Sequence, residues 1–186
     1  MKIIFLKIKL ILSVTECNGP KYSPLGCFTD DPPFSIPDYR PPQMPESIET
    51  VNPIFKLSNI RYTDRLINWL NPDPRSFQHG DVIQVLTHGW GDSYDESSFI
   101  NDARDQFKIK GNINFIGIDW SGGSKQKDYP TASANTQIIG RSIAYMFYKL
   151  KPFGHNHFQC AGHSLGAHAC SYAAKYSKQL GFTIDK

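Results

Sequence analysis

The amino-acid sequence predicts an α/β fold with a mainly parallel sheet and flanking helices, and three observations support this prediction. From about residue 53 onward, short apolar runs of strand length alternate with longer stretches of helical periodicity. Glycines and prolines mark the turns between them, and 40% hydrophobic with 20% charged residues in a chain of 186 fit one globular domain. Strands that alternate with helices form βαβ units, which bind ligands at the C-terminal ends of the strands.

The N-terminal segment is expected to lie outside this fold. Residues 1–16 are a candidate signal peptide, because Lys2 precedes an apolar stretch, but two further lysines interrupt the stretch and equally suit an amphipathic or disordered N-terminus. Residues 17–49 contain eight prolines and little periodicity, which predicts an extended arm over the surface. Residues 50–186 then form the α/β domain.

The first half of that domain carries three predicted strands, at residues 53–57, 82–86 and 113–118. Residues 95–108 place apolar side chains at helical spacing, which predicts a helix between the last two strands. In the second half, residues 133–150 form the clearest amphipathic helix.

A fourth strand is predicted at residues 157–161, after Pro152 and Gly154 have ended that helix. The Ala-rich stretch from Leu165 to about Tyr176 suits a helix packed closely on a sheet. Strand and helix therefore continue to alternate up to the end of the chain.

Charge and hydropathy exclude two classes of protein. The net charge is +3, and no run of five or six Lys or Arg provides an electrostatic surface for nucleic acid. No apolar stretch reaches the length of roughly 18 residues that spans a bilayer, so membrane contact is expected only at the surface.

The four cysteines permit three pairings. Cys17 and Cys27 lie ten apart in a stretch rich in Pro and Gly, a loop short enough for a disulfide in an oxidising compartment. Cys160 and Cys170 lie inside apolar segments and are expected to be buried thiols.

The chemistry centres on Gly162-His163-Ser164-Leu165-Gly166, which matches the pattern G-x-S-x-G. In a nucleophile elbow this pattern places a serine on a tight turn between a strand and a helix, where side chains two residues to either side would collide. The pattern alone is common by chance. Here it follows a predicted strand and opens a predicted helix, so we expect an α/β-hydrolase with Ser164 as the nucleophile.

Acyl transfer to a serine also needs two hydrogen-bond donors for the oxyanion that develops on the substrate. The backbone N–H of Leu165, directly after the nucleophile, is one expected donor. The other should come from a turn after an earlier strand, and Thr87-His88-Gly89-Trp90 is the only turn of that type, so we expect the Trp90 N–H to be the second.

With these residues in view, the chain resembles the pancreatic-lipase family of secreted animal lipases, which includes triacylglycerol lipases and phospholipases A1. The resemblance covers nearly all of residues 22–186. Its motifs are Tyr22 with Leu25-Gly26-Cys27-Phe28-Thr29-Asp30-Asp31, Thr87-His88-Gly89-Trp90, Gly117-Ile118-Asp119-Trp120, Tyr129-Pro130 with Asn135, and Gly162-His163-Ser164-Leu165-Gly166-Ala167-His168.

The departures from the family affect both disulfides and catalysis. Lys21 stands where the family has its first cysteine, so the Cys17–Cys27 disulfide that the resemblance implies is a shifted version of the usual bond. The family's cysteine pair near Asp102 has no counterpart. The family's catalytic Asp and His follow the nucleophile in motifs expected beyond Lys186, so the resemblance implies an N-terminal fragment whose hydrolase fold is truncated at the C-terminus.

Several histidines and acids near these motifs have simpler explanations. His163 and His168 cannot readily reach the Ser164 hydroxyl while also meeting an acid, and are expected to be packing residues. His155 and His157 have no Cys or acidic cluster beside them, so core or solvent positions are expected in preference to metal ligation.

The acidic residues near these motifs are likewise expected to be structural. Asp185 occupies the approach to the family's acid motif without matching it. Asp119 and Trp120 are expected to support a strand end beside the site, without chemistry.

We therefore expect a secreted, extracellular carboxylic ester hydrolase of lipids that works through an acyl-enzyme on Ser164, with no cofactor and no metal, on a lipid ester at an interface. Preference for triacylglycerol or phospholipid stays open. The alternative is a non-catalytic lipase-like binding or storage protein, or a fragment inactive because the triad Asp and His are absent from it. The fold alone would also permit an esterase, thioesterase or peptidase.

Overall fold

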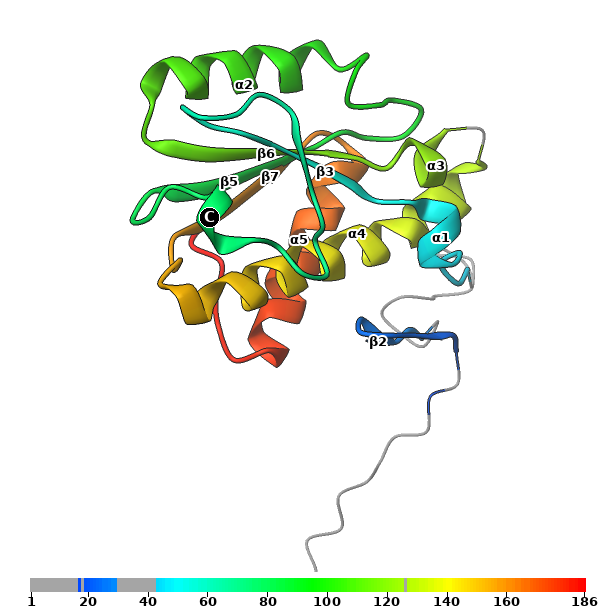
Figure 1. Ribbon diagram of the computed structural model, residues 1–186. Coiled ribbons are helices and arrows are strands. Elements are labelled where there is room, and N and C mark those ends of the chain that lie inside the picture. Colours follow the sequence, from blue (N-terminus) through cyan, green and yellow to red (C-terminus); the bar gives the residue numbers. More distant parts are fainter. Residues whose placement is uncertain (1–16, 18, 30–42, 126) are drawn as a thin grey trace, which may run out of the picture.

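A computed structural model describes residues 17, 19–29, 43–125 and 127–186 (Figure 1). The candidate signal peptide, and residues 18 and 30–42 of the Pro-rich arm, lie outside the described residues. The described part of the arm contains the short strands Lys21–Tyr22 (β1) and Gly26–Cys27 (β2), which pair antiparallel. The arm therefore has local structure that its composition did not predict.

The main sheet has five strands in the spatial order β4-β3-β6-β5-β7. Their bounds are Ile54–Ser58 (β3), Arg65–Ile67 (β4), Val82–Thr87 (β5), Ile113–Asp119 (β6) and Phe158–Gly162 (β7). β5 runs parallel to both β6 and β7. β3 runs antiparallel to both β4 and β6, so the sheet is mixed and the expectation of a mainly parallel sheet is too simple.

The reason lies in the connections. Helices link β5 to β6 and β6 to β7, and such crossovers return the chain in the same direction. Between β3 and β5 the chain contains only β4 and the short 3-10 helix Pro74–Ser76 (η1), with no crossover helix. The sequence around β4 is too polar and too short to have been predicted as a strand.

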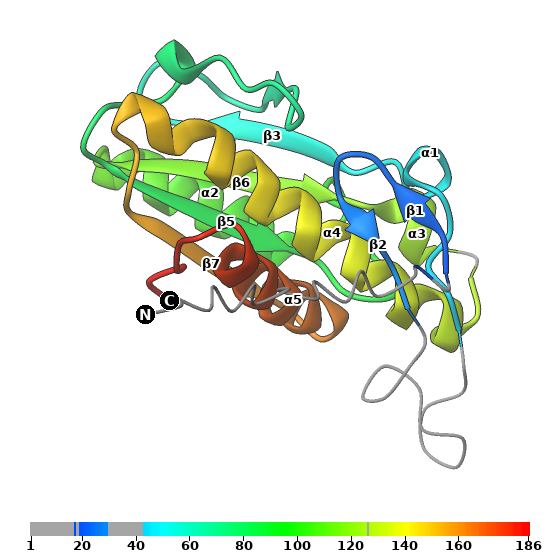
Figure 2. The same ribbon diagram turned by 90° about the horizontal axis from the view of Figure 1, so that it is seen from below.

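The helices cover both faces of the sheet (Figures 1 and 2). Their bounds are Ile48–Val51 (α1), Ser98–Lys110 (α2), Ser121–Ser124 (α3), Tyr129–Leu150 (α4) and Leu165–Gln179 (α5), with the 3-10 turn Lys151–Phe153 (η2) after α4. α2 lies on one face, and α4 and α5 lie together on the other. No helix in the described residues is both long and apolar enough to cross a membrane.

Two hydrophobic cores follow from this layering. The larger fills the space between the sheet and the pair α4 and α5, where Phe147 stacks on Phe158 with ring centroids 4.3 Å apart. The smaller lies under α2 and includes Ile100 and Phe115. Because residues of one strand alternate between the two cores, both faces of the central strands are buried.

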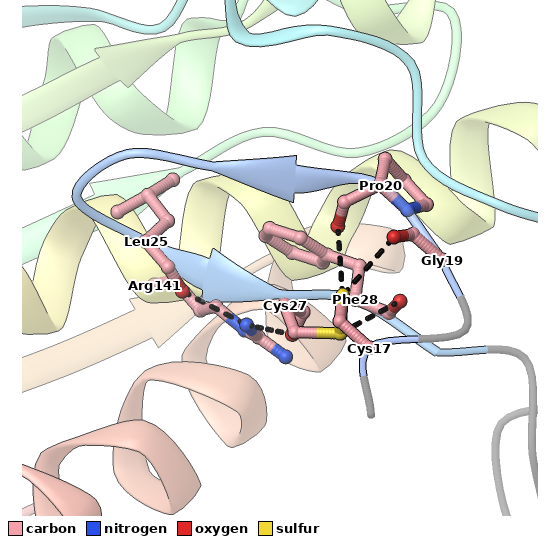
Figure 3. Close-up of a disulfide and its surroundings, with 7 residues drawn as sticks. All are labelled: Cys17, Gly19, Pro20, Leu25, Cys27, Phe28 and Arg141. Atoms are coloured by element: carbon pink, nitrogen blue, oxygen red, sulfur yellow. Dashed lines mark hydrogen bonds between the residues drawn. A yellow bond between two sulfur atoms is a disulfide. The ribbon is translucent and has the colours of Figure 1, made fainter. Parts of the chain in front are cut away.

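The N-terminal hairpin is attached to the α4 and α5 face (Figures 2 and 3). Cys17 and Cys27 form the expected disulfide. The partly buried guanidinium of Arg141 on α4 donates to the carbonyl oxygens of Leu25 at 2.9 Å and Cys27 at 2.5 Å. It also lies over the Phe28 ring, 3.9 Å from the centroid. This cation therefore holds the hairpin against the domain together with Leu25 and Phe28, which are buried in the larger core.

Cys160 and Cys170 are also bonded, with their Cα atoms 5.6 Å apart. The expectation that they are buried thiols is therefore wrong. Cys160 shares its face of β7 with Phe158, which packs against α4, so its side chain meets α5 where Cys170 lies. A Cα separation in this range is what a disulfide requires, and only the packing of α5 on β7 creates it.

Candidate active site

Ser164 occupies the turn between β7 and α5, and its backbone is strained. Its dihedrals are φ 53° and ψ −120°, a region that side chains rarely adopt and that costs about 1–3 kcal/mol. A Cβ added at Gly162 would lie 2.2 Å from the carbonyl carbon of Gly166. The expected collision across the turn is therefore present, and only glycine allows the chain to close so tightly.

The turn after β5 lies directly against this elbow. The His163 backbone N–H donates to the Thr87 carbonyl oxygen at 3.1 Å. A Cβ added at Gly89 would lie 2.9 Å from the Cβ of Ser164, and one added at Gly166 would lie 2.4 Å from the Thr87 oxygen. The two motifs found in the sequence thus meet at the C-terminal ends of neighbouring parallel strands.

The backbone N–H groups of Trp90 and Leu165 have no hydrogen-bond acceptor within the described part of the chain. That of Leu165 belongs to the first residue of α5, where a helix leaves its amides unpaired and favours negative charge. Both groups are thus available to an acceptor supplied by a bound molecule.

Residues at the end of β6 support the turn that follows β5. The fully buried ring of His88 places Nδ1 2.9 Å from the Gly89 oxygen and Nε2 3.3 Å from Asp119 Oδ1. The ring stacks on Trp120, whose indole N–H donates to the His88 carbonyl oxygen at 2.9 Å. Asp119 and Trp120 therefore support the strand ends as expected.

Hydrogen bonding determines the charge state of Asp119. Burial by itself would raise the pKa of this carboxyl, but hydrogen bonds with His88 and with the backbone N–H of Ser121 outweigh burial and lower the pKa to about 2. Asp119 therefore stays ionised at neutral pH, beneath the turn that carries Trp90.

Exposed aromatic side chains flank the elbow, which the sequence did not predict. The Trp90 ring is 50% exposed, meets Tyr129 edge to face at 5.4 Å, and donates from its Nε1 to the Lys127 oxygen. Phe99, at the start of α2, lies 5.7 Å from the ring of His163. Tyr129 is the first residue of α4 and could have been suspected from the Tyr129-Pro130 motif, whereas Phe99 carried no signal.

The histidines beside Ser164 do not pack as expected. His163 and His168 are both exposed, because they lie on the side of the elbow and of α5 that faces away from the sheet. Within the described residues, neither a histidine nor a carboxylate is hydrogen-bonded to the Ser164 hydroxyl.

The more distant histidines take the core and solvent positions that were expected. His155 is buried between Phe77 and His79, and burial lowers its pKa. His157 is exposed, with its Nδ1 3.9 Å from a carboxylate oxygen of Asp185. No group of three or more His, Cys, Asp or Glu among the described residues could hold a metal ion.

Comparison with known proteins agrees with this site. A family model described as Lipase matches residues 21–184. Pancreatic triacylglycerol lipase of Homo sapiens is 32% identical over 187 residues, which cover 90% of this chain and 37% of the relative. The Equus caballus protein of the same name is 31% identical over 90% of this chain and 38% of the relative.

A third relative, inactive pancreatic lipase-related protein 1 of Canis lupus familiaris, is 29% identical over 92% of this chain and 38% of the relative. The chain thus spans less than two fifths of the length of the curated relatives it matches. The match to the family model, with the elbow and the strand-end turn inside it, shows that the chain belongs to the pancreatic lipase family.

Proposed function

We propose that this protein is a carboxylic ester hydrolase of lipids with Ser164 as its nucleophile. The observation that carries the proposal is the strained backbone of Ser164, at a turn between strand and helix that lies against Gly89. Strain of this kind persists only where the surrounding structure imposes it, and it is concentrated at functional sites. Ser164 is exposed at this turn.

The chemistry follows from the groups around Ser164. Its oxygen would attack the ester carbonyl carbon, and the resulting oxyanion would accept hydrogen bonds from the backbone N–H groups of Trp90 and Leu165. Loss of the alcohol would leave an acyl-enzyme, and water would release the fatty acid. A general base must take the hydroxyl proton, and in the family order that histidine follows the nucleophile.

The surroundings of the site support a lipid as substrate and a secreted location. Trp90, Tyr129 and Phe99 offer exposed apolar surface beside the nucleophile, which suits an acyl chain presented at an interface. Two disulfides, one of them on the N-terminal hairpin, are typical of proteins from oxidising compartments. Together with the candidate signal peptide, they favour an extracellular protein.

The competing hypothesis is a lipase-like protein without activity. It is favoured by the word "inactive" in the name of the Canis lupus familiaris relative, because membership of the family then does not guarantee catalysis. An intact elbow with two unpaired amides favours the enzyme.

Hydrolysis of short-chain nitrophenyl esters separates these hypotheses. Apart from His168, no histidine follows Ser164 in the 186-residue chain, so we expect this chain alone to act scarcely above background, since loss of the base costs several orders of magnitude. A longer form that carries the family's Asp and His motifs should be active and should lose that activity on Ser164→Ala. His168→Ala, an exposed change one helical turn away, is the matched control and should retain it.

Two outcomes would contradict the proposal. Robust Ser164-dependent hydrolysis by the 186-residue chain would show that the base lies within it, among His88, His155 and His157. Equal activity of the longer form with and without Ser164 would end the hydrolase hypothesis.

A further inference from the structure

The Cys160–Cys170 disulfide spans the nucleophile elbow. Cys160 lies on β7 four residues before Ser164, and Cys170 lies on α5 six residues after it. The bond therefore closes a ring of chain that contains the whole glycine-serine-glycine turn. Both half-cystines are partly buried.

The position of α5 depends on its contacts with β7 and with the strand beside β7. On one side β7 pairs with β5. On the other side, within the described residues, two backbone hydrogen bonds join β7 to the end of the chain, from Asp185 N–H to the Phe158 oxygen and from Cys160 N–H to the Lys186 oxygen. The strained turn at Ser164 thus depends on how firmly α5 is held to β7.

The close approach of α5 to its neighbours leaves little tolerance for movement. A Cβ at Gly140 on α4 would lie 2.4 Å from the Ala169 oxygen of α5, and one at Gly166 would lie 2.7 Å from the His88 oxygen. A sliding of α5 along the sheet would therefore also separate the Leu165 amide from the turn that carries Trp90. The disulfide resists that sliding directly, because it joins the helix to the strand.

We propose that the Cys160–Cys170 disulfide is a positioning element of the active site, which holds the Ser164 hydroxyl and the Leu165 N–H in register with the Trp90 turn. This inference rests on the proposed ester hydrolysis. Cys160 and Cys170 touch no substrate, and they act through the geometry of the elbow. Misplacement of a reacting group by about 1 Å lowers turnover by about a hundredfold.

The Cys17–Cys27 disulfide provides a matched control for removal of Cys160–Cys170. The Cys17–Cys27 disulfide also joins residues ten apart, so both bonds close rings of the same size and restrict the unfolded chain equally. It lies on the N-terminal hairpin, held by Arg141 on the α4 and α5 face (Figure 3). Removing either bond therefore costs similar chain entropy, and only one of them brackets Ser164.

The activity test compares two double variants in the longer form that carries the Asp and His motifs. Cys160→Ala with Cys170→Ala should lower kcat about tenfold or more and change KM less than about twofold, since the lost contact acts on the transition state. Cys17→Ala with Cys27→Ala should change kcat less than about twofold. Equal kcat in both double variants would overturn the proposal.

Chemical reduction tests the same bond without an amino-acid substitution at Cys160 or Cys170. In the Cys17→Ala, Cys27→Ala background Cys160–Cys170 is the one disulfide left within the 186-residue chain, so within that chain a phosphine reductant acts on this bond alone. In the longer form, reduction should lower kcat and reoxidation should restore it, whereas a variant that also lacks Cys160 and Cys170 should not respond to the reductant. A kcat that is insensitive to complete reduction would overturn the proposal.

Hydrogen exchange separates failure of this inference from failure of the proposed function. In the 186-residue chain of the same background, reduction should speed amide exchange at residues 162–167 by about tenfold, while α2 should exchange unchanged, because only the elbow loses a restraint. Unchanged exchange at residues 162–167 would refute the restraint whatever the activity. Loss of Ser164 dependence in the ester assay would refute the hydrolase and leave the exchange result standing.

Discussion

Replacement of Gly166 by alanine is the sharpest test of the close approach between α5 and the turn after β5. The added Cβ would lie 2.4 Å from the Thr87 oxygen and 2.7 Å from the His88 oxygen, where ordinary contact begins at 3.4 Å. The backbone must therefore move by about 1 Å, since both obstructing atoms belong to the main chain and cannot rotate away.

The sign of the stability change decides between two effects. Alanine is favoured over glycine in a helix by up to about 1 kcal/mol. Overpacking against a rigid neighbour costs about 1–3 kcal/mol, and two backbone oxygens at these distances put Gly166→Ala at the upper end. The net result should be a loss of about 2 kcal/mol in the free energy of unfolding.

Urea denaturation of the 186-residue chain measures this loss. For a urea dependence of about 2 kcal/mol per molar, the midpoint should fall by about 1 M. Gly80→Ala is the control, because Gly80 has φ 82° and nothing within 4 Å of its added Cβ, so this change adds backbone strain without a collision. A midpoint raised by Gly166→Ala, as helix propensity alone would give, would refute the packing described for the elbow.

Three further predictions concern stability. Cys17→Ala with Cys27→Ala should cost about 2–3 kcal/mol of unfolding free energy by calorimetry, because the bond closes a ten-residue loop; an unchanged melting temperature would contradict this. The Asp119 pKa is lowered to about 2, so its contribution of about 2 kcal/mol should be present above about pH 4 and lost as the pH falls toward 2. Asp119→Asn should flatten that part of the stability profile in acid titrations followed by circular dichroism, and a profile that stays as steep would count against the assignment. Arg141→Met should cost about 1–3 kcal/mol and expose the hairpin to proteolysis around residues 24–28, whereas resistance equal to that of the parent would show that the hairpin is held otherwise.

Buried hydrogen bonds and a stacked pair of rings support the Trp90 turn at this end of the sheet. His88, Asp119 and Trp120 are contributed by two neighbouring strands, and together they fix the main chain that leads to Trp90. Their contacts are made by buried side chains with little freedom. A change there should therefore disturb the fold and the site together, in contrast to the exposed aromatic rings around Ser164.

The sequence by itself determined the local elements. The periodicity of residues 133–150 predicts α4, although Asp128 begins the helix earlier by accepting a hydrogen bond from the Thr131 N–H. The strands at residues 82–86, 113–118 and 157–161 agree with β5, β6 and β7 to within a residue or two. Helical spacing, strand length and turn residues are properties of a short stretch of chain, so they can be predicted from it.

The elbow was also determined locally, because its glycines are required within five consecutive residues. Only the tertiary structure decided the rest. The antiparallel pairing of β3, the strand β4 and the Cys160–Cys170 bond depend on which segments meet across the sheet. The exposure of His163 and His168 and the contact between Gly89 and Ser164 depend on the same packing. These features are set by contacts between residues far apart in the chain, whose free energies come from the burial of surfaces that no single stretch of sequence contains.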